Sequence, residues 1–172
     1  MVREHVEICL QRTCQGDKRV VYPVFVKNQN DIENEREVME VATINQKVIF
    51  ATSPHEVYEA LMDEVKHSKF TGGPARVSRE VDGKFSAYGG YCSGTNIELI
   101  PDKKIVQNWR AGSWPEDHIS KITLVFKEVP EGTELAFTHE GVPADDLEGI
   151  SEGWHLNYWN PIRKMIENAE IG

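Results

Sequence analysis

The sequence predicts an α+β fold in which one curved antiparallel β-sheet packs around a long C-terminal helix. Two observations carry this prediction. Short runs of alternating apolar and polar residues follow one another between residues 75 and 140, and this period of two is typical of an antiparallel sheet with one solvated face. After them, apolar residues recur at helical spacing: Leu147, Ile150, Trp154, Tyr158, Ile162, Met165 and Ile166.

The length and net charge of the chain exclude some classes of function. A chain of 172 residues favours one domain with a sizeable core. The formal net charge of -9 repels phosphate backbones and anionic membrane surfaces, so neither nucleic acid nor a membrane is an expected partner. No apolar run approaches the roughly 20 residues that span a bilayer. Charged residues interrupt the N-terminus where a signal peptide would be apolar, so we expect a cytoplasmic location.

The N-terminal segment carries the weakest signals. Residues 20–26 form a strand-like run, and Pro23 within it suits an edge strand. Residues 28–37 are polar and acidic, which indicates a linker or a short exposed helix. We therefore expect residues 1–40 to be an extension, present as an edge strand, an arm or a partly disordered segment. Residues 41–172 are expected to form the folded domain.

The domain is expected to begin with a strand and a helix. Residues 41–50 are strand-like and end in consecutive apolar side chains. Ser53 can then cap a helix, Pro54 suits its first turn, and Glu56 stands three residues after the cap, which together form a capping box. A second helical turn is expected to end near Phe70, because a Gly-Gly-Pro sequence follows it closely.

Four to six strands then follow in quick succession, and a long helix ends the chain. Asp82-Gly83 predicts a two-residue hairpin turn between the first two of these strands. In the final helix Pro161 removes a backbone donor, so we expect a kink, or a new start after Asn160. The expected strands cover residues 75–81, 84–88, 92–100, 104–111, 119–129 and 133–140.

Aromatic residues and strand parity indicate where contacts could form. Successive side chains of a strand point to opposite faces, so Trp109 and Arg110 must point apart. Trp109 and Trp154 are expected in the core, because aromatic side chains bury large areas. Trp114 stands beside Pro115 in a turn, which makes it the better candidate for contact with a partner.

No motif of established catalytic chemistry is present in the sequence. Gly89–Thr95 has the glycine spacing of a phosphate loop but lacks the lysine and joins two strands, so its glycines are expected to make a turn and sheet curvature. His139-Glu140 begins a zinc-protease pattern without the second histidine, and Ser93 lies in no nucleophile elbow. His139, like His118, is then expected to be a hydrogen-bonded structural histidine. We predict no catalytic residue, no cofactor, and a binding protein rather than an enzyme.

No metal site is expected either. His5, Cys9 and Cys14 lack the spacing of a zinc motif, so the three cysteines of the chain are expected to be reduced thiols. The acidic run over residues 145–148 stands where it complements the positive N-terminal end of the last helix.

Short elements spread over about three quarters of the chain together carry a family resemblance. They are FATSP (residues 50–54), VYEAL (57–61), GKF (83–85), Gly94, ELIP (98–101), KIVQNWR (104–110), SWP (113–115), HIS (118–120), TEL (133–135), GVP (141–143) and Gly153-Trp154. In their order and spacing, residues 44–169 resemble the AHSA1 domain, which is the C-terminal domain of the activator of Hsp90 ATPase and a member of the START-like (SRPBCC) superfamily.

The resemblance implies a helix-grip fold of the START and Bet v 1-like type, with a cavity between the sheet and the C-terminal helix. It also implies a co-chaperone-type ATPase activator that contacts an Hsp90-family chaperone. The alternative is a carrier or sensor of a small hydrophobic ligand, and a cyclase- or hydrolase-type enzyme is disfavoured. The eukaryotic activator has a large separate N-terminal domain, for which the segment before residue 41 is too short.

Two groups of candidate site residues follow from the resemblance and the patterns. Arg110 and Trp114 are candidates for contact with a chaperone, since arginine and tryptophan are enriched at binding hot spots. The alternative for Arg110 is an ion pair with a carboxylate such as Glu98. The candidates for lining a ligand cavity are Trp109, Phe126, Phe137, His139, Trp154 and Tyr158. The identity of the ligand and the oligomeric state stay open.

Overall fold

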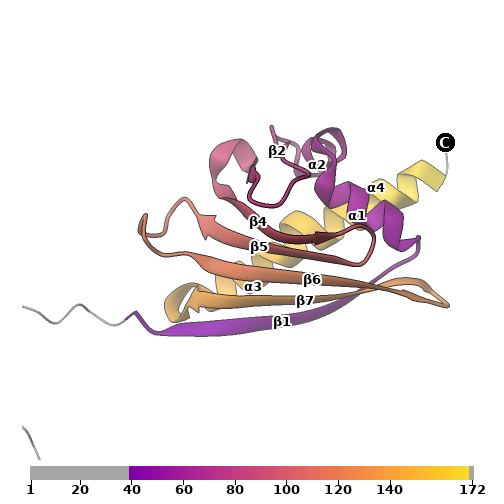
Figure 1. Ribbon diagram of the computed structural model, residues 1–172. Coiled ribbons are helices and arrows are strands. Elements are labelled where there is room, and N and C mark those ends of the chain that lie inside the picture. Colours follow the sequence, from indigo (N-terminus) through magenta and orange to yellow (C-terminus); the bar gives the residue numbers. More distant parts are fainter. Residues whose placement is uncertain (1–38, 171–172) are drawn as a thin grey trace, which may run out of the picture. The chain divides into compact units, whose positions relative to one another are not determined.

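The sheet is antiparallel throughout, as the sequence predicts. The computed structural model describes residues 39–170 (Figure 1). Within them, seven strands lie in the order β1-β7-β6-β5-β4-β3-β2, and every neighbouring pair is antiparallel. The strands are β1 (Val41–Phe50), β2 (Arg76–Val77), β3 (Lys84–Ala87), β4 (Cys92–Ile100), β5 (Lys104–Ala111), β6 (Ser120–Val129) and β7 (Gly132–Pro143). The expectations for residues 1–38, including the strand-like run 20–26, lie outside the described residues.

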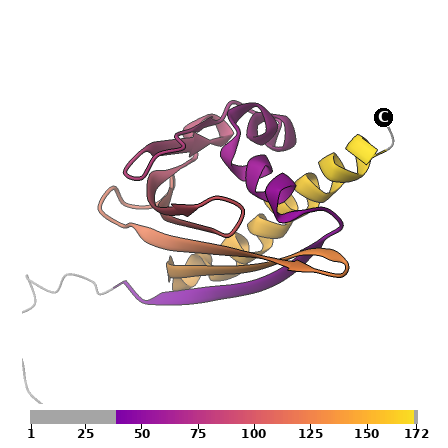
Figure 2. The ribbon, with the colours of Figure 1, turned by 45° about the vertical axis from the view of Figure 1, so that its right-hand side comes forward.

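The C-terminal helical run crosses one face of the curved sheet, as Figures 1 and 2 show, which confirms the predicted α+β helix-grip fold. The helices are α1 (Pro54–Met62), α2 (Glu64–Thr71), α3 (Leu147–Trp154) and α4 (Asn160–Glu170), with the 3-10 turns η2 (Tyr88–Gly90) and η3 (Ala144–Asp146) and the π-helical turn η4 (His155–Trp159). Between residues 39 and 170, no helix is both long enough and apolar enough to cross a membrane.

Helices α1 and α2 begin and end where their capping residues require. The Ser53 hydroxyl accepts the backbone N–H of Glu56 at 3.5 Å, so the predicted N-terminal cap is confirmed. The Glu56 carboxylate does not complete the capping box but pairs with Lys66 Nζ at 2.9 Å. Asp63 ends α1 and caps α2, because its carboxylate accepts the N–H of Lys66 at 2.8 Å. Gly72, with a φ of 68°, ends α2 in the left-handed conformation that glycine adopts readily.

The hairpin between β2 and β3 differs from its prediction. A strand over residues 75–81 with a two-residue turn is wrong, since β2 has only two residues. The buried amide of Asn96 explains the difference: its Nδ2 donates to the carbonyls of Ser78 at 2.7 Å and Glu80 at 2.8 Å, while its Oδ1 accepts from Gln107 Nε2 at 2.8 Å. These carbonyls bond to a side chain, so the chain loops around Asn96 instead of extending the ladder.

The core lies between the sheet and the helices, and strand parity places its side chains. Trp109 on β5 is 3% exposed, whereas the neighbouring Arg110 is half-buried on the opposite face. Phe126 and Phe137, on β6 and β7, are buried, as is Trp154 on α3. The prediction that Trp109, Phe126, Phe137 and Trp154 turn inward is therefore confirmed.

Candidate functional site

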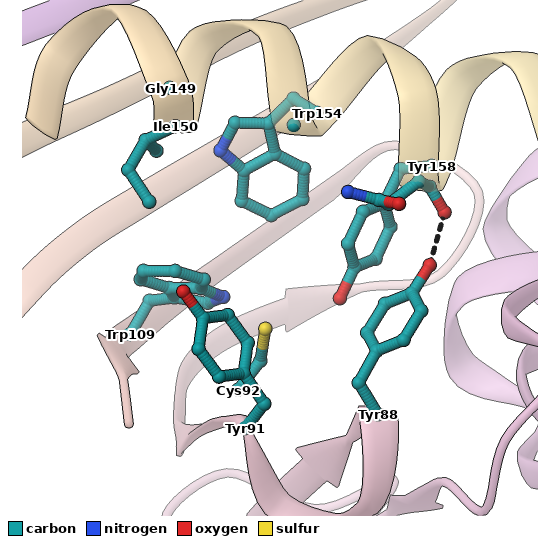
Figure 3. Close-up of a pocket in the computed structure, with 10 residues that line it drawn as sticks. Tyr88, Tyr91, Cys92, Trp109, Gly149, Ile150, Trp154 and Tyr158 are labelled. Atoms are coloured by element: carbon teal, nitrogen blue, oxygen red, sulfur yellow. Dashed lines mark hydrogen bonds between the residues drawn. The ribbon is translucent and has the colours of Figure 1, made fainter. Parts of the chain in front are cut away.

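A cleft of about 320 Å³ opens between the helical run α3–η4 and the link that joins β3 to β4 (Figure 3). Its walls are mainly aromatic, and none of its side chains carries a formal charge at neutral pH. The lining residues are Tyr88, Tyr91, Cys92, Trp109, Gly149, Ile150, Gly153, Trp154, Asn157 and Tyr158.

One wall of the cleft is a strained turn. Tyr88, Gly89 and Gly90 have φ angles of 53°, 65° and 96°, so three consecutive residues adopt positive φ. Such a conformation is unusual for tyrosine and costs of order 1–3 kcal/mol, and strain of this kind clusters at ligand clamps. The predicted turn is confirmed at Gly89 and Gly90, and it presents Tyr88 and Tyr91 to the cleft.

The opposite wall is an irregular helix, for a reason found in the sequence. In a regular α-helix the N–H of residue 161 would donate to the carbonyl of Asn157, but Pro161 has no N–H. The chain makes the π-turn η4 and restarts as α4 at Asn160, close to where the sequence predicts a restart. The hydroxyl of Tyr88 donates to the orphaned Asn157 carbonyl at 2.5 Å and so ties the strained turn to the helix (Figure 3).

The π-turn also sets which aromatic residues face the core. Its longer repeat lets Trp154 and Trp159, five residues apart, both point inward, and their rings stack at 5.5 Å with an interplanar angle of 18°. Trp159 is fully buried and donates its indole N–H to Gln46 Oε1 at 2.6 Å. A regular helical period does not predict this position for Trp159.

Two glycines hollow the face of α3 above the cleft. Gly149 and Gly153 stand one turn apart and both line it. A Cβ at Gly149 would meet no atom within 4 Å, and one at Gly153 would lie 3.7 Å from the amide nitrogen of Asn157. Glycine within a helix costs roughly 0.5–1 kcal/mol relative to alanine. The sequence therefore keeps the cleft open at a cost in helix stability.

Burial keeps the Cys92 thiol and the Tyr88 phenol of the cleft neutral at physiological pH. Burial raises the pKa of the Cys92 thiol to about 12. Burial likewise raises the pKa of Tyr88 to about 12. Because the thiolate is the nucleophilic form of cysteine, Cys92 is not a reactive nucleophile in this setting.

The Ser120–His139 pair has the spacing of a nucleophile and its base, but its hydrogen bonds run in the wrong direction. Trp154 Nε1 donates to His139 Nδ1 at 3.1 Å, so the histidine proton is on Nε2 and is donated to Ser120 Oγ at 2.8 Å. The Ser120 hydroxyl in turn donates to the carbonyl of Trp109 at 2.7 Å. Burial lowers the pKa of His139 to about 3, so the ring is neutral. With no free lone pair on the histidine, the pair cannot activate the serine.

A second cavity, of only about 20 Å³, lies behind the cleft and shares Trp109, Trp154 and Tyr158 with it. Its lining includes His67, which hydrogen-bonds the carbonyl of Leu61 through Nδ1 at 2.9 Å. His67 Nε2 is therefore an acceptor, and it has no partner within the described part of the chain. Trp109 Nε1, a donor, is the other buried nitrogen without a partner there.

Half of the predicted cavity residues line the cleft, namely Trp109, Trp154 and Tyr158. The other half lie in filled core. Phe126 packs edge-to-face on Tyr58 with ring centroids 5.8 Å apart, and Phe137 contacts the rings of Trp154 at 4.5 Å and Trp159 at 5.2 Å. His139 is fully buried in the network with Ser120 described above.

The sequence patterns did not predict the wall formed by Tyr88 and Tyr91, nor the helix face formed by Gly149 and Gly153. Two signals for them were present. Adjacent glycines between strands marked an unusual turn, and two glycines at a spacing of four residues marked a flat helix face.

Arg110 clamps the loop between β5 and β6 onto the sheet. Its Nε donates to the carbonyl of Pro115 at 3.0 Å, and its Nη2 donates to the carbonyl of Trp114 at 2.7 Å. The alternative ion pair with Glu98 is not formed, because Glu98 Oε2 pairs with Lys104 Nζ at 2.7 Å.

Trp114 anchors the same loop from inside. The expectation that its indole is available at the surface is wrong, because the side chain is 4% exposed and packs on Trp109 at 5.2 Å. Its Nε1 donates to Asp146 at 2.7 Å, so the acidic run before α3 serves this contact. The ring of His118 hydrogen-bonds the carbonyl of Gly141 at 2.8 Å and pins the end of the loop.

Between residues 39 and 170, no group of three or more His, Cys, Asp or Glu side chains is placed to hold a metal ion. The candidates weighed from the sequence, His5, Cys9 and Cys14, lie outside the described residues.

The amino-acid sequence of this chain is similar to those of known proteins. Residues 51–167 match the family model described as Activator of Hsp90 ATPase homolog 1-like protein. The chain is 37% identical over 123 residues to the human "Activator of 90 kDa heat shock protein ATPase homolog 1", which covers 72% of this chain and 36% of that protein. The mouse "Activator of 90 kDa heat shock protein ATPase homolog 2" is 31% identical over 161 residues, covering 94% of this chain and 46% of that protein. The chain thus spans less than half the length of these relatives.

Solved structures agree with the fold. The crystal structure of an HSP90 activator from Plasmodium falciparum matches with a TM-score of 0.67 at 27% identity, covering 74% of this chain and 96% of that chain. The solution structure of the Aha1 dimer from Colwellia psychrerythraea matches with a TM-score of 0.59 at 22% identity, covering 67% of this chain and 89% of that chain. The second likeness shows the fold alone.

Proposed function

Because the chain belongs to the family of Activator of Hsp90 ATPase homolog 1-like proteins, we propose that it binds an Hsp90-family ATPase and raises its rate of ATP hydrolysis. The observation that carries this proposal is the 37% identity with the human activator over 123 residues. The Plasmodium activator supports it, because 96% of that solved chain matches this domain. Such a partner accords with the cytoplasmic location expected from the sequence.

The clamped β5–β6 loop is the surface we assign to this contact. Arg110 and Trp114 hold it rigidly from below, so its tip loses little conformational freedom when a partner binds. The tip exposes Glu116 and Asp117, and the adjoining Ile119 is 52% exposed. An exposed apolar side chain flanked by carboxylates is complementary to an apolar site with a basic rim on the partner.

Binding rather than catalysis is the role that the interior supports. The Ser120–His139 pair is locked in a neutral hydrogen-bonded network, and the Cys92 thiol is protonated. The candidates Arg110 and Trp114 therefore act through the shape of the loop, with Arg110 the more informative of the two because it is only half-buried.

The test measures binding to an Hsp90-family ATPase from the same cell and the turnover of that ATPase. Arg110→Ala removes the donor to two loop carbonyls, so we expect affinity to fall about tenfold, which corresponds to about 1.4 kcal/mol. Lys127→Ala, an exposed change near the far end of β6, is the matched control and should leave affinity unchanged. Equal affinity for Arg110→Ala and the control would refute the assignment of this loop. Absence of binding by the unmodified protein would refute the proposed function.

A further inference from the structure

We propose that the outer edge of strand β1 is a docking site for an extended segment of a partner protein. The segment adds a strand to the sheet and places lysine or arginine side chains beside Glu148 and Glu152 of α3. This surface shares no residue with the aromatic cleft or with the loop assigned to the ATPase, so the proposal does not depend on the proposed function.

The two edges of the sheet differ in length. Strand β2 forms one edge and has two residues, whereas β1 forms the other and has ten (Figure 1). Natural proteins commonly block long edges with bulges, prolines or charged side chains. In β1 the register shift lies near the start, between Ala42 and Thr43, the strand has no proline, and its one lysine, Lys47, is paired with Glu134 at 3.2 Å. An edge of this length is a template for another strand.

The alternation of the backbone shows which groups face the outer edge. The carbonyl of Phe50 points at β7, because a Cβ on Gly132 would lie 2.2 Å from its oxygen. The carbonyl of Ile49 points the other way and accepts from Arg163 Nη2 at 3.5 Å. In an antiparallel strand the N–H and C=O of alternate residues point to the same edge. The other edge-facing backbone groups of the regular part of β1 are therefore those of Thr43, Asn45 and Lys47.

These backbone groups are available for pairing. Among residues 39–170, no hydrogen bond to the backbone of Thr43, Asn45 or Lys47 is formed across the outer edge. An added strand would supply donors and acceptors to all three residues in the ladder pattern of the existing sheet. Main-chain hydrogen bonds of this kind give affinity without selecting a sequence, so the side chains beside the edge decide which segment binds.

A groove of about 680 Å³ lies beside this edge, between β1 and α3. Residues 43–45 line it from the strand, and Glu148, Ser151 and Glu152 line it from the helix. Gln46 fixes the two elements together, since its Nε2 donates to the Ser151 carbonyl at 2.9 Å and its Oε1 accepts from Trp159 at 2.6 Å. The groove is thus formed before a partner arrives, which lowers the entropic cost of binding.

The helix side of the groove carries negative charge without a counter-charge. Glu148 and Glu152 are both exposed, and neither forms an ion pair within the part of the chain that the structure describes. Two carboxylates four residues apart on a helix repel each other. Lysine or arginine side chains from a partner would relieve this repulsion, so the groove is complementary to a basic segment.

The spacing of the two carboxylates fits a strand. Four helical residues rise about 6 Å, and two strand residues advance about 6.6 Å. The helical run follows β1, since Ser151 contacts Gln46 near the middle of the strand and Arg163 contacts Ile49 near its end. An added strand therefore brings two side chains of its inner face, two residues apart, to the two carboxylates. This selects a segment with basic residues at alternate positions.

A second copy of this chain is the competing occupant. Two β1 edges could pair about a two-fold axis and form one continuous sheet. Such pairing would bring Glu148 and Glu152 of both copies to one seam, and each copy carries a formal net charge of -9. Like charges that face each other across an interface oppose association. A basic segment is attracted by the same carboxylates, so we assign the edge to it.

Short peptides test the docking directly. The probe acetyl-TVKVKVT-amide places both lysines on one face of a strand, and acetyl-TVEVEVT-amide is its acidic counterpart. Titration into the full chain, followed by NMR of the backbone amide signals, gives affinity and site together. We expect the lysine peptide to shift the signals of Thr43, Asn45 and Lys47 and to slow their hydrogen exchange. The acidic peptide should bind at least about tenfold more weakly.

Two substitutions at one position isolate the contribution of the backbone. Asn45→Pro and Asn45→Ala both remove the side chain, but only proline also removes the N–H that faces the edge. Proline is tolerated on edge strands where the N–H faces solvent, so the pairing of β1 with β7 should persist. We expect Asn45→Pro to bind the lysine peptide about tenfold more weakly than Asn45→Ala does.

A second pair of variants isolates the charge and does not require that proline be tolerated. Glu148→Gln/Glu152→Gln should weaken binding of the lysine peptide about fivefold. Glu128→Gln/Glu131→Gln removes the same charge at exposed positions near the β6–β7 turn, outside the groove, and should leave affinity unchanged.

Four results would overturn the proposal. The first is no binding of the lysine peptide, or equal affinity for the two peptides. The second is equal affinity of Asn45→Pro and Asn45→Ala, which would exclude strand addition. The third is equal affinity of the two double variants, which would exclude the carboxylates. The fourth is a dimer in sedimentation that Asn45→Pro dissociates, which would assign the edge to a second copy.

Discussion

Truncating Trp154 to alanine tests three roles of this side chain at once. Trp154 packs in the core, lines the cleft and donates a hydrogen bond to His139. The indole is 4% exposed and contacts the rings of Phe137 and Tyr158, each at 4.5 Å. Removing a packed tryptophan costs about 3–5 kcal/mol. The change also leaves His139 Nδ1 without its donor, which adds roughly 1–3 kcal/mol. Water entering from the cleft offsets part of this loss, so we expect the free energy of unfolding to fall by about 4 kcal/mol.

Urea denaturation followed by far-UV circular dichroism measures this loss directly. Trp154→Phe keeps most of the packing and removes only the N–H, so it should cost about 1–3 kcal/mol. Leu156→Ala, a truncation at a 57% exposed position in the adjoining π-turn, is the matched control and should change stability by less than about 0.5 kcal/mol. A loss below about 1.5 kcal/mol for Trp154→Ala would refute the packed arrangement described here.

Two further predictions concern pH and the π-turn. Burial lowers the pKa of His139 to about 3 and also lowers that of His67, whereas both titrate near 6.5 when unfolded. Stability should therefore be full above about pH 6.5 and fall as the pH drops below it. His139 should contribute a loss of up to about 1.4 kcal/mol per pH unit between pH 6.5 and 3, and His67 adds a loss in the same direction. Unfolding free energies that stay constant from about pH 6.5 to 4.5 would contradict this. Tyr88→Phe should cost about 1–2 kcal/mol, but less in a Pro161→Ala background, where alanine supplies its own N–H to the orphaned carbonyl. A double-mutant cycle with no coupling would disprove that explanation.

Strand positions were predictable because the signals are local. The runs 41–50, 92–100 and 104–111 match β1, β4 and β5, since alternation along a strand is read directly from neighbouring residues. The inward orientation of Trp109 and the outward orientation of Arg110 follow from the same period. What these side chains contact was not predictable, because their partners come from other parts of the chain.

Features that depend on distant residues escaped prediction. The bond between Tyr88 and Asn157 joins residues 69 positions apart, and nothing near either residue indicates the other. Asn96 shortens β2 by bonding to carbonyls 16 and 18 residues earlier, so the Asp82-Gly83 signal predicted the hairpin but not its length. Trp114 was expected to be available for contact because it stands in a turn beside Pro115, yet its side chain is buried and its indole N–H reaches Asp146, 32 residues further along the chain.

The rate of ATP hydrolysis by an Hsp90-family chaperone from the same cell tests the central claim most directly. We predict that this rate rises with the concentration of the purified protein and saturates, and that a specific Hsp90 inhibitor abolishes the increase. A rate that stays at its basal value, while circular dichroism shows the protein to be folded, would contradict the claim that this chain is an activator of the chaperone.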